Sequence, residues 1–259
     1  MSTLSVSNIT GNPTSALGTT NATSVNSAVV SVGTNFVANT SQLTVATPLS
    51  ANGGTGTSGQ VLSSNGATGS PYWKTLSLIA NIQVFTSSGT FTVPAGITRV
   101  KISAVGGGGG GAQAPNASGG GAGAYALKIF TVTPGDSITV NIGSGGAVNT
   151  DGGDTTVIYG ATTVTAGGGK KGNSGNGATG GAGGDASGGD LNVGGGGGQQ
   201  TMQYSTSYYS GVGGSSFFGG GGNSPSSSTS GAAKAYGAGG AGGNSTNGTG
   251  AAGVVIVEY

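Results

Sequence analysis

Six carboxylates are the side chains of this sequence with the most chemistry to offer. They are Asp136, Asp151, Asp154, Asp185, Asp190 and Glu258. The chain has no histidine and no cysteine, which excludes nucleophilic triads built on those bases. Asp151 and Asp154 flank two glycines and are spaced closely enough for a carboxylate pair. An aspartate beside glycine at the start of a strand is usually a turn former, so we predict that the chain is not an enzyme.

Glycine-rich stretches partly match several ligand-binding motifs, but none of these matches predicts a site. Residues 180–188 approach the calcium-binding nonapeptide repeat, but Ser187 stands where that repeat has an apolar residue. Matches to Gly-x-Gly-x-x-Gly arise by chance among 61 glycines, and no phosphate-binding Gly-x-x-x-x-Gly-Lys-Ser/Thr is present. We therefore expect no metal and no cofactor.

The charge of the chain excludes other partners. Charged residues make up 5% of the sequence, the formal net charge is +1, and Lys170 and Lys171 form the only adjacent basic pair. Binding of nucleic acid or anionic lipid needs clustered Lys or Arg. No segment approaches the ~20 apolar residues of a membrane span, and the N-terminal residues lack the pattern of a secretory signal. We expect no nucleic acid and no membrane insertion.

One segment, residues 199–218, interrupts the glycines with bulky side chains. Tyrosine with serine and glycine is the composition of recognition loops, because tyrosine offers contact area and a hydroxyl at a small entropy loss. Packing against the glycine tracts is the alternative, which we expect for Phe217 and Phe218. The predicted receptor-binding residues of this segment are Met202, Gln203, Tyr204, Tyr208 and Tyr209. Secondary candidates are the loops 113–118 with Asn116, 149–151, and 223–236 with Lys234 and Tyr236.

The elements that must position these residues are the glycine tracts. Glycine falls on every third position at Gly169, Gly172, Gly175, Gly181 and Gly184, with Ala178 in one slot. Residues without a Cβ can form an extended left-handed helix with about three residues per turn and no internal hydrogen bonds. Packed side by side, such helices can bond to their neighbours as polyglycine II. A disordered Gly/Ser linker is the alternative.

Alternating apolar residues predict strands on both sides of the densest tracts. We expect a hairpin of residues 125–132 and 137–142 across Pro134–Gly135–Asp136, and a second of 155–159 and 162–166. Further strands are expected at 84–85, 90–93, 99–105 and 254–257. Strands stand first and last, so a small sheet should hold both ends while the glycine segments project from it.

The first 75 residues are rich in Ser, Thr, Asn and Val, with apolar residues too sparse for an independent core. Such a segment can bury its side chains by wrapping with identical chains as a threefold β-shaft; a disordered tether is the alternative. A strand at 60–64 and a turn at Asn65–Gly66 are expected, with Trp73 packing where the shaft ends.

The predicted fold class is therefore mainly β and irregular. Residues 1–75 form a β-rich, trimeric shaft or attachment segment, and 76–259 form a glycine-rich head. The head comprises strands over 82–166, polyglycine II over 167–253 and a closing strand over 254–259.

Residues 82–259 resemble the glycine-rich domain of phage tail-fibre and adhesin proteins. Residues 84–102 read VFTSSGTFTVPAGITRVKI, like the opening of that domain. The order of later motifs agrees: Val105 with its glycine run, Thr133-Pro-Gly-Asp, and the ending GVVIVEY. Residues 1–75 are similar in character to phage-fibre shafts, whereas detached adhesins lack such a segment.

The resemblance implies a non-enzymatic virion protein, assembled in the host cytoplasm. Its polyglycine II head would bind a host outer-membrane protein or surface glycan, and it would contact other fibre or baseplate proteins, as a homotrimer. Two other classes stay open: a decoration, neck or capsid fibre with structural duty alone, and an ice- or surface-binding polyglycine protein of cellular origin.

Overall fold

A computed structural model of the chain describes residues 54–65, 70–75, 81–204, 207–223, 230–244 and 248–259. The chain divides into two compact units, Met1–Leu76 and Ser77–Tyr259. Most of the predicted shaft, residues 1–53, lies outside the described residues.

In the first unit, β1 (Gln60–Ser63) pairs antiparallel with β2 (Tyr72–Thr75). This confirms the strand expected at 60–64. Trp73 packs within this unit, where its indole N–H donates to the carbonyl oxygen of Gly54 at 2.9 Å. Gly56, at a φ of 70°, lies against the ring, so closely that a Cβ there would be 2.6 Å from a ring carbon.

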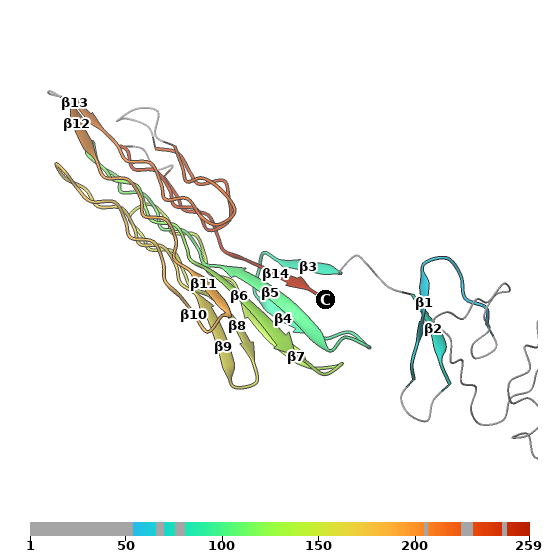
Figure 1. The fold of residues 1–259 in the computed structure, drawn as a ribbon. Coiled ribbons are helices and arrows are strands. Elements are labelled where there is room, and N and C mark those ends of the chain that lie inside the picture. Colours follow the sequence, from blue (N-terminus) through green and yellow to red (C-terminus); the bar gives the residue numbers. More distant parts are fainter. Residues whose placement is uncertain (1–53, 66–69, 76–80, 205–206, 224–229, 245–247) are drawn as a thin grey trace, which may run out of the picture. The chain divides into compact units, whose positions relative to one another are not determined.

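The second unit contains two five-stranded antiparallel sheets, which Figure 1 shows together. Sheet I has the order β10-β9-β8-β7-β4, formed by Ala186–Ser187, Thr162–Ala166, Thr155–Tyr159, Ser137–Asn141 and Gly89–Thr92. Sheet II has the order β11-β6-β5-β14-β3, formed by Leu191–Val193, Tyr125–Thr131, Arg99–Val105, Val254–Glu258 and Ile82–Phe85. The closing strand β14 lies between β5 and β3, so the sheet holds both ends of the unit, as expected.

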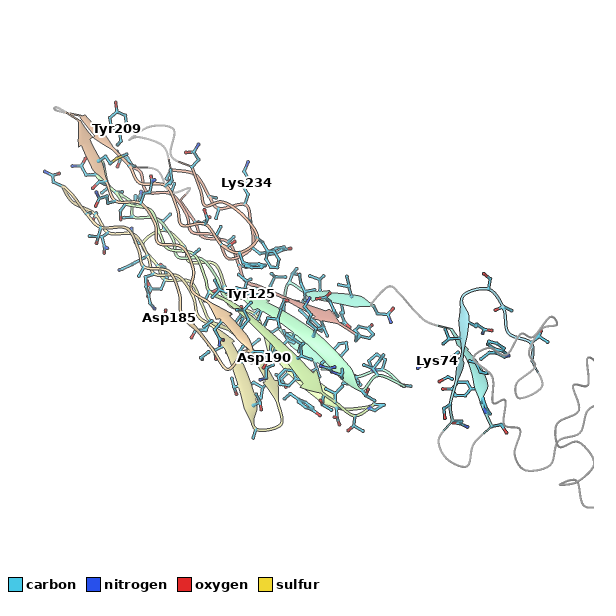
Figure 2. All side chains as sticks on the ribbon, in the orientation of Figure 1. Lys74, Tyr125, Asp185, Asp190, Tyr209 and Lys234 are labelled. Carbon is cyan, nitrogen blue, oxygen red and sulfur yellow. The ribbon has the colours of Figure 1, made fainter. Side chains whose placement is uncertain are left out.

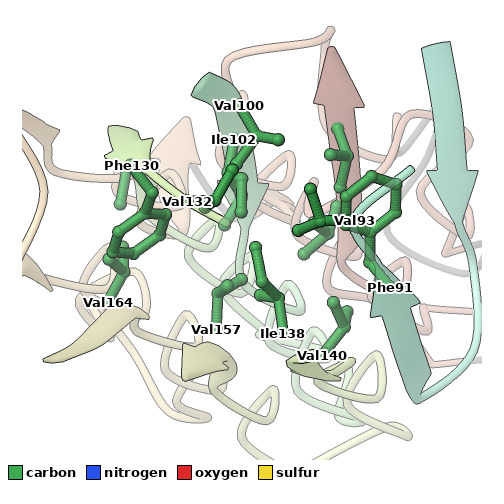
Figure 3. Packing of buried hydrophobic residues seen from close by; sticks show 14 of the residues in the cluster. Phe91, Val93, Val100, Ile102, Phe130, Val132, Ile138, Val140, Val157 and Val164 are labelled. Carbon is green, nitrogen blue, oxygen red and sulfur yellow. The ribbon is translucent and has the colours of Figure 1, made fainter. Parts of the chain in front are cut away.

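The hydrophobic core lies between the inner faces of the two sheets (Figure 3). Sheet I contributes Phe91, Ile138, Val157 and others, and sheet II contributes Ile102, Phe130 and others, all with 6% exposure or less. The strands alternate as their sequence predicts, with one apolar face on this core.

The hairpin predicted across Pro134–Gly135–Asp136 is wrong. The turn exists, with Gly135 at a φ of 92°, but β6 belongs to sheet II and β7 to sheet I. Val132 before the turn and Ile138 after it are both buried in the core between the two sheets. The chain therefore crosses from sheet II to sheet I at this turn. The second expected hairpin, β8 with β9, is confirmed.

The glycine-rich segments run from the sheets to the opposite end of the unit (Figure 1). We call these extended, unpleated segments struts and identify each by its residues. Strut 106–112 shows their packing most clearly. The N–H groups of Gly106 and Gly109 donate to strut 118–124, those of Gly107 and Gly110 to residues 150–153, and those of Gly108 and Gly111 to residues 248–251.

The carbonyl oxygens of the same strut repeat the pattern. Gly107 and Gly110 accept from residues 169–172, Gly108 and Gly111 from residues 146–149, and Gly109 from Gly240. Every third residue thus bonds to the same neighbour, as expected of a helix with about three residues per turn. Strut 118–124 is enclosed in the same way, with N–H donation to the carbonyls of struts 167–173, 196–199 and 237–240. The struts therefore form a polyglycine II bundle.

The bundle differs from the expected polyglycine II region in two respects. It extends upstream of residues 167–253, because the buried struts 106–112 and 118–124 belong to it together with the buried residues 237–243. The threefold register from Gly169 to Gly184 is also not one strut, because residues 174–177 turn the chain and Gly175 has a φ of 127°. Among the described residues there is no helix capable of crossing a membrane.

Candidate binding surface at the strut ends

The topology gathers loops at the strut ends that lie far from the sheets. Struts 106–112 and 118–124 continue β5 and precede β6, so the loop between them lies at the remote end. The same reasoning places residues 148–150, residues 174–177 and the hairpin of β12 (Met202–Tyr204) with β13 (Ser207–Tyr209) there. Figure 1 shows β12 and β13 at that end. We call this the tip.

Hydrogen bonds tie the tip loops to one another. The Gln113 N–H donates to Asn149 Oδ1 at 3.0 Å, and Asn149 adopts a φ of 62°, a left-handed conformation that asparagine tolerates. Asn116 Nδ2 donates to Asn176 Oδ1 at 2.6 Å, and the Gly175 N–H donates to the Asn116 carbonyl at 2.9 Å. Loops far apart in sequence are thus fixed relative to one another.

The base of the hairpin is anchored to the same loops. The Thr201 N–H donates to the Ala178 carbonyl at 3.2 Å, and the Gly211 N–H donates to the Ala117 carbonyl at 3.0 Å. Both strands of the hairpin therefore rise from positions that the bundle holds in place.

The hairpin carries all five predicted site residues of this segment. Met202 and Tyr209 are cross-strand partners, and they are 57% and 52% exposed. The backbone register also pairs Gln203 with Tyr208 and Tyr204 with Ser207; the side chains of these residues lie outside the described part. Figure 2 places Tyr209 at the tip.

The other two predicted residues do not join this pair. Asn116 is half-buried at the tip, where its amide is engaged by Asn176, so its first role is to hold two loops together. Tyr236 is 44% exposed but lies beside Gly237, whose N–H donates to Ala252 and whose carbonyl accepts from Gly123. These partners are at the sheet-proximal end, so Tyr236 is remote from the tip.

Phe217 and Phe218 also lie near the sheets. Phe217 stacks on Tyr125 of β6 with ring centroids 3.9 Å apart and planes inclined by 11°, and Phe218 meets Phe217 edge-on. Phe217 therefore packs where strut 118–124 passes into β6, at the position of Tyr125 in Figure 2.

The carboxylates act as acceptors for backbone and neighbouring side chains. Asp151 accepts from the Lys171 N–H at 2.8 Å and pairs with Lys170 Nζ at 3.2 Å, and the Lys171 amide is the main reason that its pKa is lowered. Asp154 accepts from the Gly168 N–H at 2.8 Å. Both aspartates therefore hold strut 167–173 in place through long-range hydrogen bonds.

Two more aspartates stabilise the sheets. The Tyr159 hydroxyl donates to Asp136 at 2.6 Å, which lowers the pKa of Asp136 and raises that of the tyrosine. Lys128 pairs with Asp190 at 2.6 Å and lowers the pKa of that carboxyl. Within the described residues no group of three His, Cys, Asp or Glu side chains is arranged to hold a metal ion.

Sequence reasoning missed two polar residues that fix the tip, Asn176 and Thr201, and it named Asn149 only as part of a candidate loop. In the sequence these are ordinary loop residues, and only the pairing of the struts shows which loops meet.

A family model described as a glycine-rich domain matches residues 86–259. No curated protein matches the chain.

Proposed function

This chain belongs to the glycine-rich domain family, and we propose that it is a fibre protein of a phage virion whose glycine-rich unit binds the host cell surface. Residues 1–75 would assemble copies, as a trimer, and attach them to other fibre or baseplate proteins. The phage origin rests on the sequence resemblance; the binding role rests on the tip.

The observation that carries the binding role is the exposed Met202–Tyr209 pair at the end of a cross-linked bundle. A strut alone has no internal hydrogen bonds and is flexible, but an enclosed strut is fixed from several sides. A bundle of this kind can present short loops far from its sheets without losing their relative positions. Pre-ordered loops lose less entropy on binding, which favours affinity.

The chemistry of the hairpin points to a neutral partner. No Lys, Arg, Asp or Glu occurs between residues 191 and 233. Binding should therefore rest on aromatic contact and hydrogen bonds to an outer-membrane protein or a surface glycan, with little dependence on salt.

Adsorption of particles to host cells tests the proposal. Replacing both Tyr208 and Tyr209 with alanine should abolish adsorption while fibres still assemble. Tyr236→Ala is the matched control, because this tyrosine is also exposed but lies near the sheets, and it should adsorb normally. Normal adsorption by the double variant would overturn the assignment of the tip.

The second candidate is a decoration, neck or capsid fibre with a purely structural role. The hydrogen bond between the Asn116 and Asn176 amides favours it, since tip residues here also serve to hold loops together. Competition separates the two functions: purified chain should block adsorption if it binds the host and should have no effect if it is structural alone.

A further inference from the structure

The loop of residues 174–177, which turns the chain at the tip, contains an asparagine followed by glycine. Asn176 and Gly177 are both exposed. In the other three Asn-Gly pairs of the sequence, at least one residue lies outside the described part. The main-chain nitrogen after an asparagine can reach the carbonyl carbon of that side chain and close a five-membered ring with it. Glycine leaves this nitrogen unobstructed, because it has no Cβ beside it.

The nitrogen of Gly177 is accessible for such a reaction. Its N–H donates no hydrogen bond within the described residues, whereas the N–H groups of Gly175 and Ala178 donate to the carbonyls of Asn116 and Gly175. Gly177 has a φ of 71°, and no atom lies within 4 Å of the position that a Cβ would take. Water can therefore reach the amide proton that must leave before the nitrogen attacks.

The side-chain carbonyl of Asn176 is held and polarised by the neighbouring loop. Asn116 Nδ2 donates to Asn176 Oδ1 at 2.6 Å. When a nucleophile adds to a carbonyl carbon, negative charge collects on the oxygen, and a hydrogen-bond donor already in place stabilises that charge. Asn176 Nδ2, the group that has to leave, donates no hydrogen bond to any residue that the structure describes.

We propose that Asn176 is a site of spontaneous modification, at which the main-chain nitrogen of Gly177 displaces the side-chain amide. The bond from the Gly177 nitrogen to Asn176 Cγ forms and the Cγ–Nδ2 bond breaks. Nδ2 leaves as ammonia with the proton of the Gly177 amide, and a cyclic imide remains. One water molecule then opens the ring at either carbonyl, which yields aspartate or isoaspartate without oxidation or reduction. Attack from within the chain needs no second molecule to be brought into position.

Asn173 shows that exposure alone does not select the site. Asn173 is exposed as well, but its Nδ2 donates to the Thr179 carbonyl at 3.0 Å, so that its leaving group is engaged. The residue after it is Ser174, whose Cβ crowds the main-chain nitrogen. Asn173 and Asn176 therefore lie close together in the sequence but differ in both reacting groups.

The modification would change how the tip loops are held together. Loop 113–118 and loop 174–177 are joined by the Gly175 N–H, which donates to the Asn116 carbonyl at 2.9 Å, and by the Asn116–Asn176 side-chain bond. An isoaspartyl link adds one methylene to the main chain and makes the former Cγ carbonyl part of it, so the side-chain bond is lost. Aspartate keeps the acceptor but adds a negative charge. Formation of isoaspartate should therefore loosen the two loops, and this chemistry does not depend on host binding.

Peptide mapping by mass spectrometry tests the site. The full chain is incubated in its folded state at mildly alkaline pH and digested at intervals. Conversion of Asn176 to aspartate and isoaspartate should exceed conversion of Asn173, the internal control, at least several-fold. Asn176→Gln is the matched variant: it keeps an amide, but its attack would need a six-membered ring, so position 176 should stay unmodified. Equal conversion of the two asparagines, or none at Asn176, would overturn the proposal.

Asn116→Ala tests the hydrogen-bond donor. Removing Asn116 Nδ2 should slow conversion of Asn176 several-fold, with the Tm of the chain unchanged. Conversion that is equally fast or faster in this variant would mean that Asn116 only restrains the loop, and its assigned part in the reaction would be wrong.

Amide hydrogen exchange tests the consequence. The Gly175 amide should exchange faster in aged chain that contains isoaspartate than in fresh chain, and it should stay unchanged in aged Asn176→Gln chain. Unchanged exchange in converted chain would contradict the loosening of the loops. Host adsorption is a separate readout: particles that adsorb normally after their tip loops have loosened would count against the tip as the binding surface, while the modification itself would stand.

Discussion

Replacing Gly110 with alanine should destabilise the bundle, although it adds one methyl group. A Cβ at Gly110 would overlap the carbonyl oxygen of Ala147 and lie 2.7 Å from its carbonyl carbon. Ordinary van der Waals contact begins near 3.4 Å, so the carbonyl carbon alone requires residues 146–149 to move by about 0.7 Å, and the nearer oxygen requires more. The obstacle is backbone, which cannot rotate away as a flexible side chain can.

The magnitude follows from what that movement breaks. Residues 146–149 are bonded to strut 106–112 through Gly146 N–H to Gly108 at 2.8 Å and Asn149 N–H to Gly111 at 3.0 Å. Weakening two such bonds costs about 0.5–1.5 kcal/mol each. Overpacking adds about 1–3 kcal/mol. Alanine has less conformational freedom than glycine in the unfolded chain, which stabilises the folded state by about 0.4–1 kcal/mol and partly offsets these losses. The free energy of unfolding should fall by about 1–5 kcal/mol in total.

Differential scanning calorimetry of the full chain measures this change. A loss of about 3 kcal/mol corresponds to a fall in Tm of about 6–12 °C for a unit of this size. Gly197→Ala is the control, because Gly197 is exposed, has no positive φ, and a Cβ there would lie 3.6 Å from its nearest neighbour. Its Tm should stay unchanged or rise. Equal shifts in the two variants would refute the reasoning, because only Gly110 is enclosed.

Three further outcomes are expected. Phe91→Ala should lower the free energy of unfolding by about 3–5 kcal/mol in a denaturant titration, because Phe91 is 1% exposed in the core; a change under 1 kcal/mol would contradict the two-sheet packing. Gly56→Ala should shift the emission of Trp73, the only tryptophan, to longer wavelength as the ring is displaced; an unchanged spectrum would count against their contact. The lowered pKa of Asp151 means that its stabilisation is complete above the unfolded-state pKa of about 3.9 and is lost as the pH falls through the lower folded-state value. Asp151→Asn should therefore lower the free energy of unfolding at pH 6 but not at pH 2, by less than about 1 kcal/mol because the carboxylate is half exposed. The same loss at both pH values, measured by denaturant titration, would exclude an ionic origin.

Much of the strand structure could be predicted from the sequence. Alternation such as that of residues 99–105 marks one buried face, and turns at Gly96, Gly135 and Gly160 take the positive φ that glycine tolerates. The confirmed hairpin of β8 with β9 follows from these local signals.

Sheet membership could not be predicted in the same way. Alternation shows that β6 and β7 each bury a face, but it does not show that the two faces meet across a core instead of pairing edge to edge. The error over the hairpin at Gly135 arose at this step.

The neighbours of each strut were equally hidden. Glycine has no side chain from which a contact can be read, so Gly110 and Gly197 look alike in sequence although one is enclosed and the other is exposed. For the same reason the sequence placed Tyr236 and Tyr209 in one set of candidates, whereas the struts separate them along the length of the bundle.

Amide hydrogen exchange tests the polyglycine II bundle most directly. The amides of Gly109, Gly110, Gly120 and Gly121 donate to neighbouring struts, whereas those of Gly194 and Gly197 donate no backbone hydrogen bond within the described residues. The first set should exchange only as the whole unit unfolds, and the second set should exchange rapidly. Exchange of the first set at the rate of an unstructured peptide would contradict the bundle.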